Sequence, residues 1–128
     1  MSMNKVIVTG GAGFIGSNLV ERLLKDGAEE ILIIDDFSTG KKENLHDSSK
    51  VHLIESKLED INDLESQFKG YDFCFHLAAG VGVQYIMDNL SDSLLTNIQG
   101  THIVFEACKE NNIPCLLYTS PSPRDWTI

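Results

Sequence analysis

Basic residues are scarce in this sequence of 128 residues. Ten lysines and arginines stand against nineteen aspartates and glutamates, which gives a formal net charge of −9. A chain with this charge repels a phosphate backbone, so we expect no nucleic-acid partner. No apolar run approaches the ~20 residues that span a membrane, and the first residues reach a strand pattern too soon for a signal peptide. We therefore expect no membrane partner either.

Cysteine is also sparse, and its spacing excludes several classes of site. Cys74, Cys108 and Cys115 are odd in number and show no CxxC spacing. Two of them lie inside apolar runs, which is typical of reduced thiols in a core. This pattern favours a cytoplasmic protein with neither a disulfide framework nor a metal site.

The length fits one domain, and its apolar residues alternate between two periods. Short apolar runs predict buried strands at residues 5–10, 30–35, 51–55 and 73–79. Helical periodicity predicts helices from residue 14 to a stop at Gly27, from residue 60 to a stop at Gly70, and from about 91 to 111. This alternation predicts an α/β fold with a doubly wound parallel sheet. The segment 36–50 is long for a connection, which indicates a working loop with a short helix around residues 41–45.

A cluster of glycines separates the first predicted strand from the first predicted helix. Gly10, Gly11, Gly13 and Gly16 satisfy both G-x-G-x-x-G and G-x-x-G-x-x-G. Such a turn brings main-chain N–H groups against a pyrophosphate and places the anion at the helix N-terminus. A purely structural turn would look much the same, but the position between strand and helix favours a Rossmann-like nucleotide-binding domain.

Asp35 ends the second predicted strand, 19 residues beyond Gly16. A dinucleotide fold places here the carboxylate that accepts hydrogen bonds from the adenosine ribose. Its charge also repels a 2′-phosphate, so NAD is favoured over NADP as the cofactor. Two alternatives stay open: the acidic pair is a solvated turn or cap, or Lys41 and Lys42 neutralise a 2′-phosphate and NADP binds.

Four segments together resemble the extended short-chain dehydrogenase/reductase family, in particular its NAD-dependent nucleotide-sugar epimerases and dehydratases. They are VTGGAGFIGSNLVERLL (8–24), IIDDFSTG (33–40), FHLAAGVGV (75–83) and TNIQGTHIVFEAC (96–108). Their order and spacing carry a resemblance that covers roughly residues 4 to 113.

The resemblance implies a cofactor site with three parts. The glycine turn, with Gly10, Gly13, Phe14, Ile15 and Gly16, would line the pyrophosphate, while Asp35, Asp36, Phe37, Ser38 and Gly40 would surround the adenosine. Leu77, Ala78 and Ala79 would pass under the cofactor, and Asn97 would steady the site from the long helix. The duller alternatives are that the two alanines are small because a helix crosses there, and that Asn97 faces solvent.

One position departs from the family pattern. The family usually has an acid after the third strand that contacts the adenine amino group, whereas Lys57 stands there in this chain. Leu58 could still supply backbone contacts to the adenine, so adenine selectivity is less secure. His76 and His102 need no special role, because one lies in a buried strand and the other beside apolar neighbours on a helix.

By the same resemblance, catalysis would require a Tyr-x-x-x-Lys pair. The tyrosine would exchange a proton with the sugar hydroxyl while hydride passes to the nicotinamide. No such pair occurs here, since the three tyrosines are followed four residues later by Phe75, Asn89 and Ser122. We therefore expect no catalytic residue in this chain, which alone would be inactive.

Three functions remain after this comparison of motifs. The favoured one is the N-terminal, cofactor-binding part of an NAD-dependent nucleotide-sugar epimerase or dehydratase, an incomplete Rossmann-like domain whose full-length protein would be a homodimer. Its nucleotide-sugar substrate would be oxidised transiently and then regain the hydride. The alternatives are a non-catalytic NAD(P)-binding sensor module, and an NAD(P)H reductase or hydroxysteroid-type dehydrogenase of the same extended family.

The end of the chain raises a separate question of origin. CLLYTSPSPRD (115–125) resembles the uninterrupted translation of a transposase adapter used in sequencing libraries, and the adapter's preceding base would complete the codon of Pro114. We expect a truncated NAD(P)-binding Rossmann domain at 1–114 and a non-native tail at 115–128. The alternative is a genuine fifth strand with an unusual turn at Pro121. Four strands alone would leave an apolar edge and face uncovered, which predicts poor solubility.

Sequencing the source locus across codon 114 tests the boundary. We expect the genomic codons after Pro114 to differ from the adapter and to continue the reading frame with other residues. Finding the same codons in an open frame at the locus would refute the non-native tail.

Overall fold

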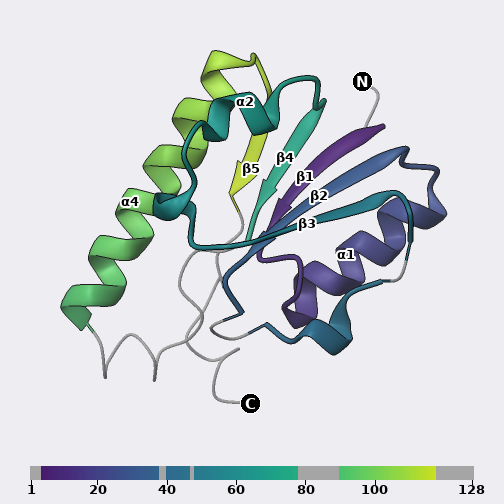
Figure 1. Cartoon of the computed structure of the whole chain (residues 1–128), viewed down its shortest axis with the longest axis horizontal. Helices are drawn as coiled ribbons and strands as arrows, with labels where there is room; N and C mark the ends of the chain where they lie inside the picture. Colours follow the sequence, from purple (N-terminus) through teal and green to yellow (C-terminus); the bar gives the residue numbers. More distant parts are fainter. Residues whose placement is uncertain (1–3, 38–39, 47, 78–89, 118–128) are drawn as a thin grey trace.

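The computed structural model describes residues 4–37, 40–46, 48–77 and 90–117, with side chains of 90–99 and 117 left aside. Its strands are β1 (Lys5–Thr9), β2 (Glu30–Asp35), β3 (Val51–Glu55), β4 (Phe73–His76) and β5 (Cys115–Leu117). The helices are α1 (Phe14–Lys25), α2 (Leu64–Phe68) and α4 (Leu90–Glu110), with 3₁₀ turns η1 (Lys42–Asn44) and η2 (Leu58–Asp60). The strands form one parallel sheet in the order β3-β2-β1-β4-β5 (Figure 1).

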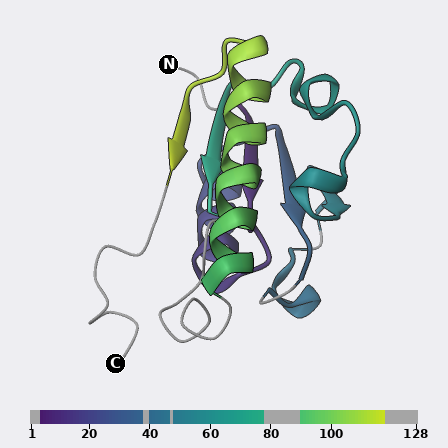
Figure 2. The same ribbon diagram turned by 90° about the vertical axis from the view of Figure 1, so that its left-hand side faces the viewer.

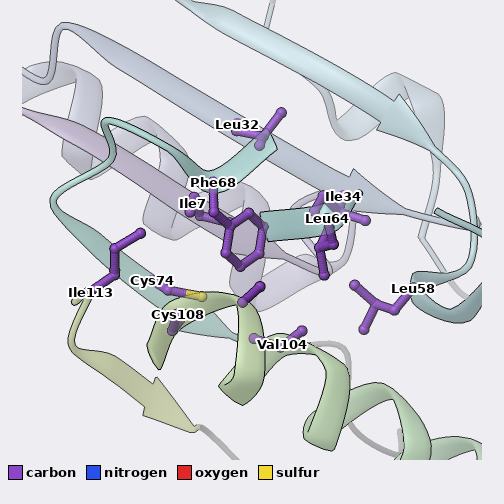
Figure 3. Close-up of a cluster of buried hydrophobic side chains, with 11 residues drawn as sticks. Ile7, Leu32, Ile34, Leu58, Leu64, Phe68, Cys74, Val104, Cys108 and Ile113 are labelled. Carbon is purple, nitrogen blue, oxygen red and sulfur yellow. The ribbon is translucent and has the colours of Figure 1, made fainter. Parts of the chain in front are cut away.

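Helices cover both faces of this sheet, because successive side chains of a strand point to opposite faces. Val6 and Val8 of β1 belong to the cluster that packs against α1, whereas Ile7 belongs to the cluster beneath α2 and α4. Figures 1 and 2 show α1 and α4 on opposite sides of the strands, and Figure 3 shows the second cluster. The predicted doubly wound α/β fold is confirmed.

The central strands explain why the apolar runs were uniform rather than alternating. Val6, Ile7 and Val8 are fully buried, and the apolar residues of β2 are at most 5% exposed. A parallel strand covered on both faces needs apolar side chains at every position. The predicted strands at 30–35 and 51–55 have the bounds of β2 and β3.

One predicted helix is divided. The single helix expected over residues 60–69 is instead the turn η2 followed by the short helix α2. Asp63 has φ 57° and ψ 44°, a left-handed conformation that a right-handed helix cannot contain. Asp63 therefore separates η2, which ends at Asp60, from α2, which begins at Leu64. Leu64 is buried together with Phe68.

A fifth strand stands where four were expected. Cys115 pairs with Cys74, and Leu117 pairs with His76, in parallel register. The apolar run at 115–117 thus satisfies backbone groups along the outer edge of β4. The pairing shows where these residues lie, and the boundary at residue 114 stays a prediction about the gene.

The longest described helix has no transmembrane character. Within the described ranges, α4 and the other helices are too short or too polar to cross a bilayer.

Candidate functional site

The candidate site lies at the carboxyl ends of β1, β2 and β4. The chain continues from β1 towards β2 on one side, while β4 pairs with β1 on the other. Ligands of open α/β sheets bind where the strand order reverses in this way, outside the carboxyl ends of the strands. Thr9, Asp35 and His76 end these three strands at that edge.

Three positions of the turn that follows β1 favour glycine strongly: Gly10, Gly16 and Gly11, where a methyl group would lie 2.6 Å from Cγ2 of the buried Ile33. Gly10 has φ 75°, a left-handed conformation that other residues avoid. A methyl group on Gly16 would overlap the carbonyl oxygen of Gly10, so α1 can cross the turn this closely only without a side chain there. Gly13 is less constrained, since a methyl group would lie 3.4 Å from the same oxygen. Gly10, Gly13 and Gly16 thus lie in the turn after β1 and at the start of α1, where the sequence predicted a glycine turn.

Helix α1 begins directly after this turn and presents free donors. The Ser17 N–H donates to the Gly13 carbonyl at 2.9 Å, whereas the N–H groups of Phe14, Ile15 and Gly16 precede the first intrahelical bond. The first turn carries no acidic residue. The side chains of Phe14 and Ile15 are 80% and 48% exposed. This helix end can bind an anion, because its N–H groups and dipole both favour negative charge.

Asp35 links the turn to the loop after β2. One of its carboxylate oxygens accepts the Ala12 N–H at 3.0 Å, and the other accepts the Phe37 N–H at 2.8 Å. Asp35 is only 8% exposed, whereas Asp36 beside it is exposed. Phe37 has φ 60°, a strained conformation for an aromatic residue that its N–H bond to Asp35 helps to hold. Asp35 and Phe37 thus lie beside the glycine turn, and their contact with an adenosine stays a prediction.

The loop after β2 also packs on the glycine turn. The individual contacts between the two segments were not predicted from the sequence. The Lys41 N–H and the Asn44 side-chain amide both donate to the Ala12 carbonyl, at 3.1 and 2.8 Å. Nε2 of His46 lies 3.0 Å from the Ser17 carbonyl in α1. Only the short helix expected around 41–45, present as η1, pointed to this arrangement.

Gly40 brings the loop after β2 close to the glycine turn. A methyl group on it would lie 2.9 Å from both the Ala12 Cβ and a carboxylate oxygen of Asp35. The loop can therefore approach the glycine turn this closely only with glycine at this position.

The lysines of this loop bear on the choice between NAD and NADP. Nζ of Lys42 lies 3.1 Å from the Glu55 carboxylate and 5.6 Å from the centre of the Phe37 ring. Its charge is thus shared with an acid and an aromatic face, and Lys41 is exposed. Both contacts draw the Lys42 ammonium away from a 2′-phosphate. Binding of NADP would therefore require Lys41 alone to neutralise that phosphate, or Lys42 to leave these contacts.

A buried histidine holds the end of β4 against β1. Nδ1 of His76 lies 2.6 Å from the Thr9 hydroxyl, and Nε2 lies 3.0 Å from the Thr101 hydroxyl. The Leu77 N–H donates to the Thr9 hydroxyl at 2.9 Å. His76 is 1% exposed, and this burial lowers its pKa below the ordinary value, with a smaller opposing effect of Cys115. A neutral imidazole satisfies both contacts, with one nitrogen as donor and the other as acceptor.

The structure describes some of the remaining predicted residues and leaves others undescribed. Leu58 is 8% exposed and packs in the core near Gly100, and its role towards adenine stays a prediction. Lys57 is exposed at the start of η2. The structure does not describe Ser38, Ala78, Ala79 and the side chain of Asn97.

Three sulfur atoms meet between β4, β5 and α4. The Sγ atoms of Cys74, Cys108 and Cys115 lie within 4.8 Å of one another. Hydrogen bonding among the thiols and burial raise the pKa of Cys74 and raise that of Cys108 to about 12, whereas hydrogen bonds to Cys108 and Cys74 lower the pKa of Cys115. Three such sulfurs can ligate a soft metal, but Cys115 lies beyond residue 114, and the proposed gene-encoded part supplies only two.

Comparisons with known proteins agree with this geometry. Residues 6–123 match the model of the family described as NAD dependent epimerase/dehydratase. A UDP-glucose 4-epimerase of Mycolicibacterium smegmatis is 36% identical over 121 residues, which cover 91% of this chain and 38% of that protein.

Solved structures give the same result. A UDP-N-acetylglucosamine 4-epimerase of Methanobrevibacter ruminantium M1, in complex with UDP-N-acetylmuramic acid, has a TM-score of 0.79 and 40% identity over 88% of this chain and 36% of its own. The Bordetella bronchiseptica enzyme WbmG in complex with NAD has a TM-score of 0.80 and 33% identity, over 94% and 38% of the two chains. This chain therefore spans about two fifths of the length of the proteins it matches.

Replacing two of the glycines by alanine tests whether close packing, rather than membership of the motif, determines the effect of each glycine on stability. Gly16→Ala should lower the free energy of unfolding by about 1–3 kcal/mol, because its methyl group must displace the Gly10 carbonyl. Gly13→Ala, with ordinary φ and room for a methyl group, should leave it unchanged or raise it by about 0.4–1 kcal/mol. Urea unfolding of the chain at low protein concentration measures both. Equal losses would contradict the packing argument.

His76 should make the chain less stable in mild acid. Its folded-state pKa is lowered, so between that pKa and the ordinary value of about 6.5 the unfolded chain binds more protons, and stability falls as pH falls. His76→Asn cannot titrate and should lose less unfolding free energy than the wild type between pH 7 and pH 5. Parallel curves for the two proteins in urea titrations would show that His76 does not contribute.

Proposed function

The chain belongs to the NAD-dependent epimerase/dehydratase family, and we propose that it is the cofactor-binding part of an enzyme that acts on nucleotide sugars. The observation that carries the proposal is the glycine turn, which ends in a free helix N-terminus and is tied to the buried carboxylate of Asp35. Two of the relatives named above add the substrate class, since their names are those of UDP-sugar epimerases.

The residues of the turn fit a dinucleotide diphosphate. Phe14, Ile15 and Gly16 supply backbone N–H groups at the start of α1, and the glycines leave the approach free of side chains. Asp35 already accepts two backbone N–H groups, but a carboxylate has about four acceptor positions. Its remaining positions can accept the ribose hydroxyls, so the same side chain would hold both the turn and the cofactor.

The choice of NAD over NADP follows from charge. The Asp35 carboxylate would lie beside the 2′ position of the ribose, where a phosphate would be repelled. Lys42, one of the two cations that could offset this repulsion, is paired with Glu55. We therefore assign NAD as the cofactor.

The chemistry divides between the cofactor and the protein. Bound NAD supplies a nicotinamide that accepts and returns hydride. The residues of this chain would bind the diphosphate, orient the adenosine and support the cofactor through Leu77 at the end of β4. A proton acceptor for the sugar hydroxyl would come from a Tyr-x-x-x-Lys pair encoded downstream of residue 114, so the chain alone would be inactive.

Two other functions use the same site. A sensor module would bind NAD(P) without chemistry, and a reductase or hydroxysteroid-type dehydrogenase would release its reduced cofactor. The full-length gene separates enzyme from sensor, because only an enzyme needs Tyr-x-x-x-Lys downstream. Relatives named as an epimerase and as a decarboxylase both act on UDP sugars by name, so we keep the nucleotide-sugar enzyme as the proposal. We also keep the proposal that its full-length protein is a homodimer.

Calorimetric titration of the full-length gene product with NAD and NADP tests the proposal. The wild type should bind NAD more tightly than NADP. Asp35→Asn should weaken NAD at least tenfold, because a neutral amide replaces a charged acceptor, and it should narrow the difference from NADP.

Asp26→Asn is the matched control, since Asp26 is an exposed aspartate at the far end of α1. Its NAD affinity should equal that of the wild type. A wild-type protein that takes up neither NAD nor NADP would overturn the proposed function.

A further inference from the structure

We propose that Asn44 is a positioning residue for the cofactor, holding the glycine turn in its diphosphate-binding conformation before the cofactor arrives. The inference rests on the proposed function and assigns a role to a residue outside the glycine motif. It starts from the Ala12 carbonyl oxygen, which lies 2.8 Å from the Asn44 side-chain nitrogen.

The peptide groups on either side of Ala12 are held from two directions. The Ala12 N–H donates to Asp35 at 3.0 Å, and the Ala12 carbonyl accepts from both Asn44 and the Lys41 N–H, at 2.8 and 3.1 Å. Ala12 is fully buried. A buried carbonyl that loses a partner has little water to replace it, so the Asn44 amide contributes directly to the orientation of this peptide group.

That orientation determines where the next donors point. The peptide bond is planar and trans, so the Gly13 N–H points away from the Ala12 carbonyl. Gly13 is the residue that caps α1, and the donors proposed for the diphosphate follow it immediately. Holding the Ala12 carbonyl towards the loop thus directs the start of α1.

A glycine turn needs such a restraint more than an ordinary turn does. Glycine populates many backbone conformations, and ordering them on binding costs entropy that is subtracted from affinity. The Asn44 contact orders the glycine turn during folding, so this entropy is lost before the ligand binds. Two contacts hold η1 without the ligand: the Lys42 ammonium pairs with Glu55 at the end of β3, and the Asn44 N–H donates to the Lys41 carbonyl at 3.0 Å.

The side-chain chemistry is specific. An amide donates to a carbonyl, whereas an aspartate at this position would bring two acceptors together and add a negative charge near the diphosphate. Asn44→Asp should therefore be worse than Asn44→Ala, and Asn44→Gln, which keeps the amide on a longer stem, should recover part of the wild-type affinity. If Asn44 only filled space, the nearly isosteric aspartate would keep more of the wild-type affinity than either alanine or glutamine.

Calorimetry of the full-length gene product with adenosine, ADP and NAD distinguishes positioning from general stability. Asn44→Ala should weaken ADP and NAD about tenfold, the effect of one hydrogen bond to a buried carbonyl, while adenosine binding changes less than about twofold. Adenosine serves as the internal reference because it reaches Asp35 but has no diphosphate.

Asn111→Ala is the matched control. The Asn111 amide also donates to two backbone carbonyls, those of Glu65 and Ala107, at 2.8 and 2.9 Å, but between α2 and α4. This variant should lose stability without losing NAD affinity. If Asn44→Ala fails to fold, the comparison of Asn44→Gln with Asn44→Asp tests the same point.

The outcomes separate this inference from the function on which it rests. A wild type that binds NAD while Asn44→Ala binds it equally well would overturn the role of Asn44 alone. Equal losses for adenosine and NAD would also overturn it, because they would indicate a general disturbance of the loop. A wild type that binds no dinucleotide would instead overturn the proposed function.

Discussion

The carboxylate of Asp35 is the interaction on which the rest of the site depends. It is almost fully buried at the end of β2 and accepts N–H groups from the glycine turn and from the loop after β2. These two segments are far from ideal secondary structure, and each has a residue with positive φ, Gly10 and Phe37. The shared acceptor joins the two segments, and the Asn44 and Lys41 donors to the Ala12 carbonyl join them a second time. One carboxylate therefore helps to order both the turn and the loop.

Much of the fold could be predicted because its signals are local. Uniform apolar runs identify strands buried on both faces, and the change to helical period at Phe14 identifies α1. Glycine is informative for a different reason, since a left-handed φ at Gly10 and a helix crossing at Gly16 admit almost no other residue. The sequence thus specified the turn, α1 and the acid of β2, which together make the proposed diphosphate and ribose side of the site.

The remaining contacts could not be predicted because they are made between segments whose sequence separation carries no period. Asn44 reaches Ala12 across 32 residues, and His76 reaches Thr9 across 67. An asparagine in a loop and a histidine in a strand are each common, and only the register of the sheet brings them to these partners. The left-handed Asp63 was missed for a related reason, because the apolar spacing of residues 61–68 is compatible with one continuous helix.

The division of chemistry between cofactor and protein explains why a cofactor site can be proposed from this chain and a catalytic residue cannot. Oxidation of a sugar alcohol releases a hydride and a proton, so a nicotinamide needs a proton acceptor beside it. Burial lowers the pKa of His76, which lies at the edge of the site, but both its nitrogens contact hydroxyls and the ring is 1% exposed. Its ring braces β4 against β1 and α4 and cannot reach a substrate. The residues proposed for the diphosphate and the ribose, by contrast, lie between Gly10 and Asn44, in the loops that follow β1 and β2 and at the start of α1.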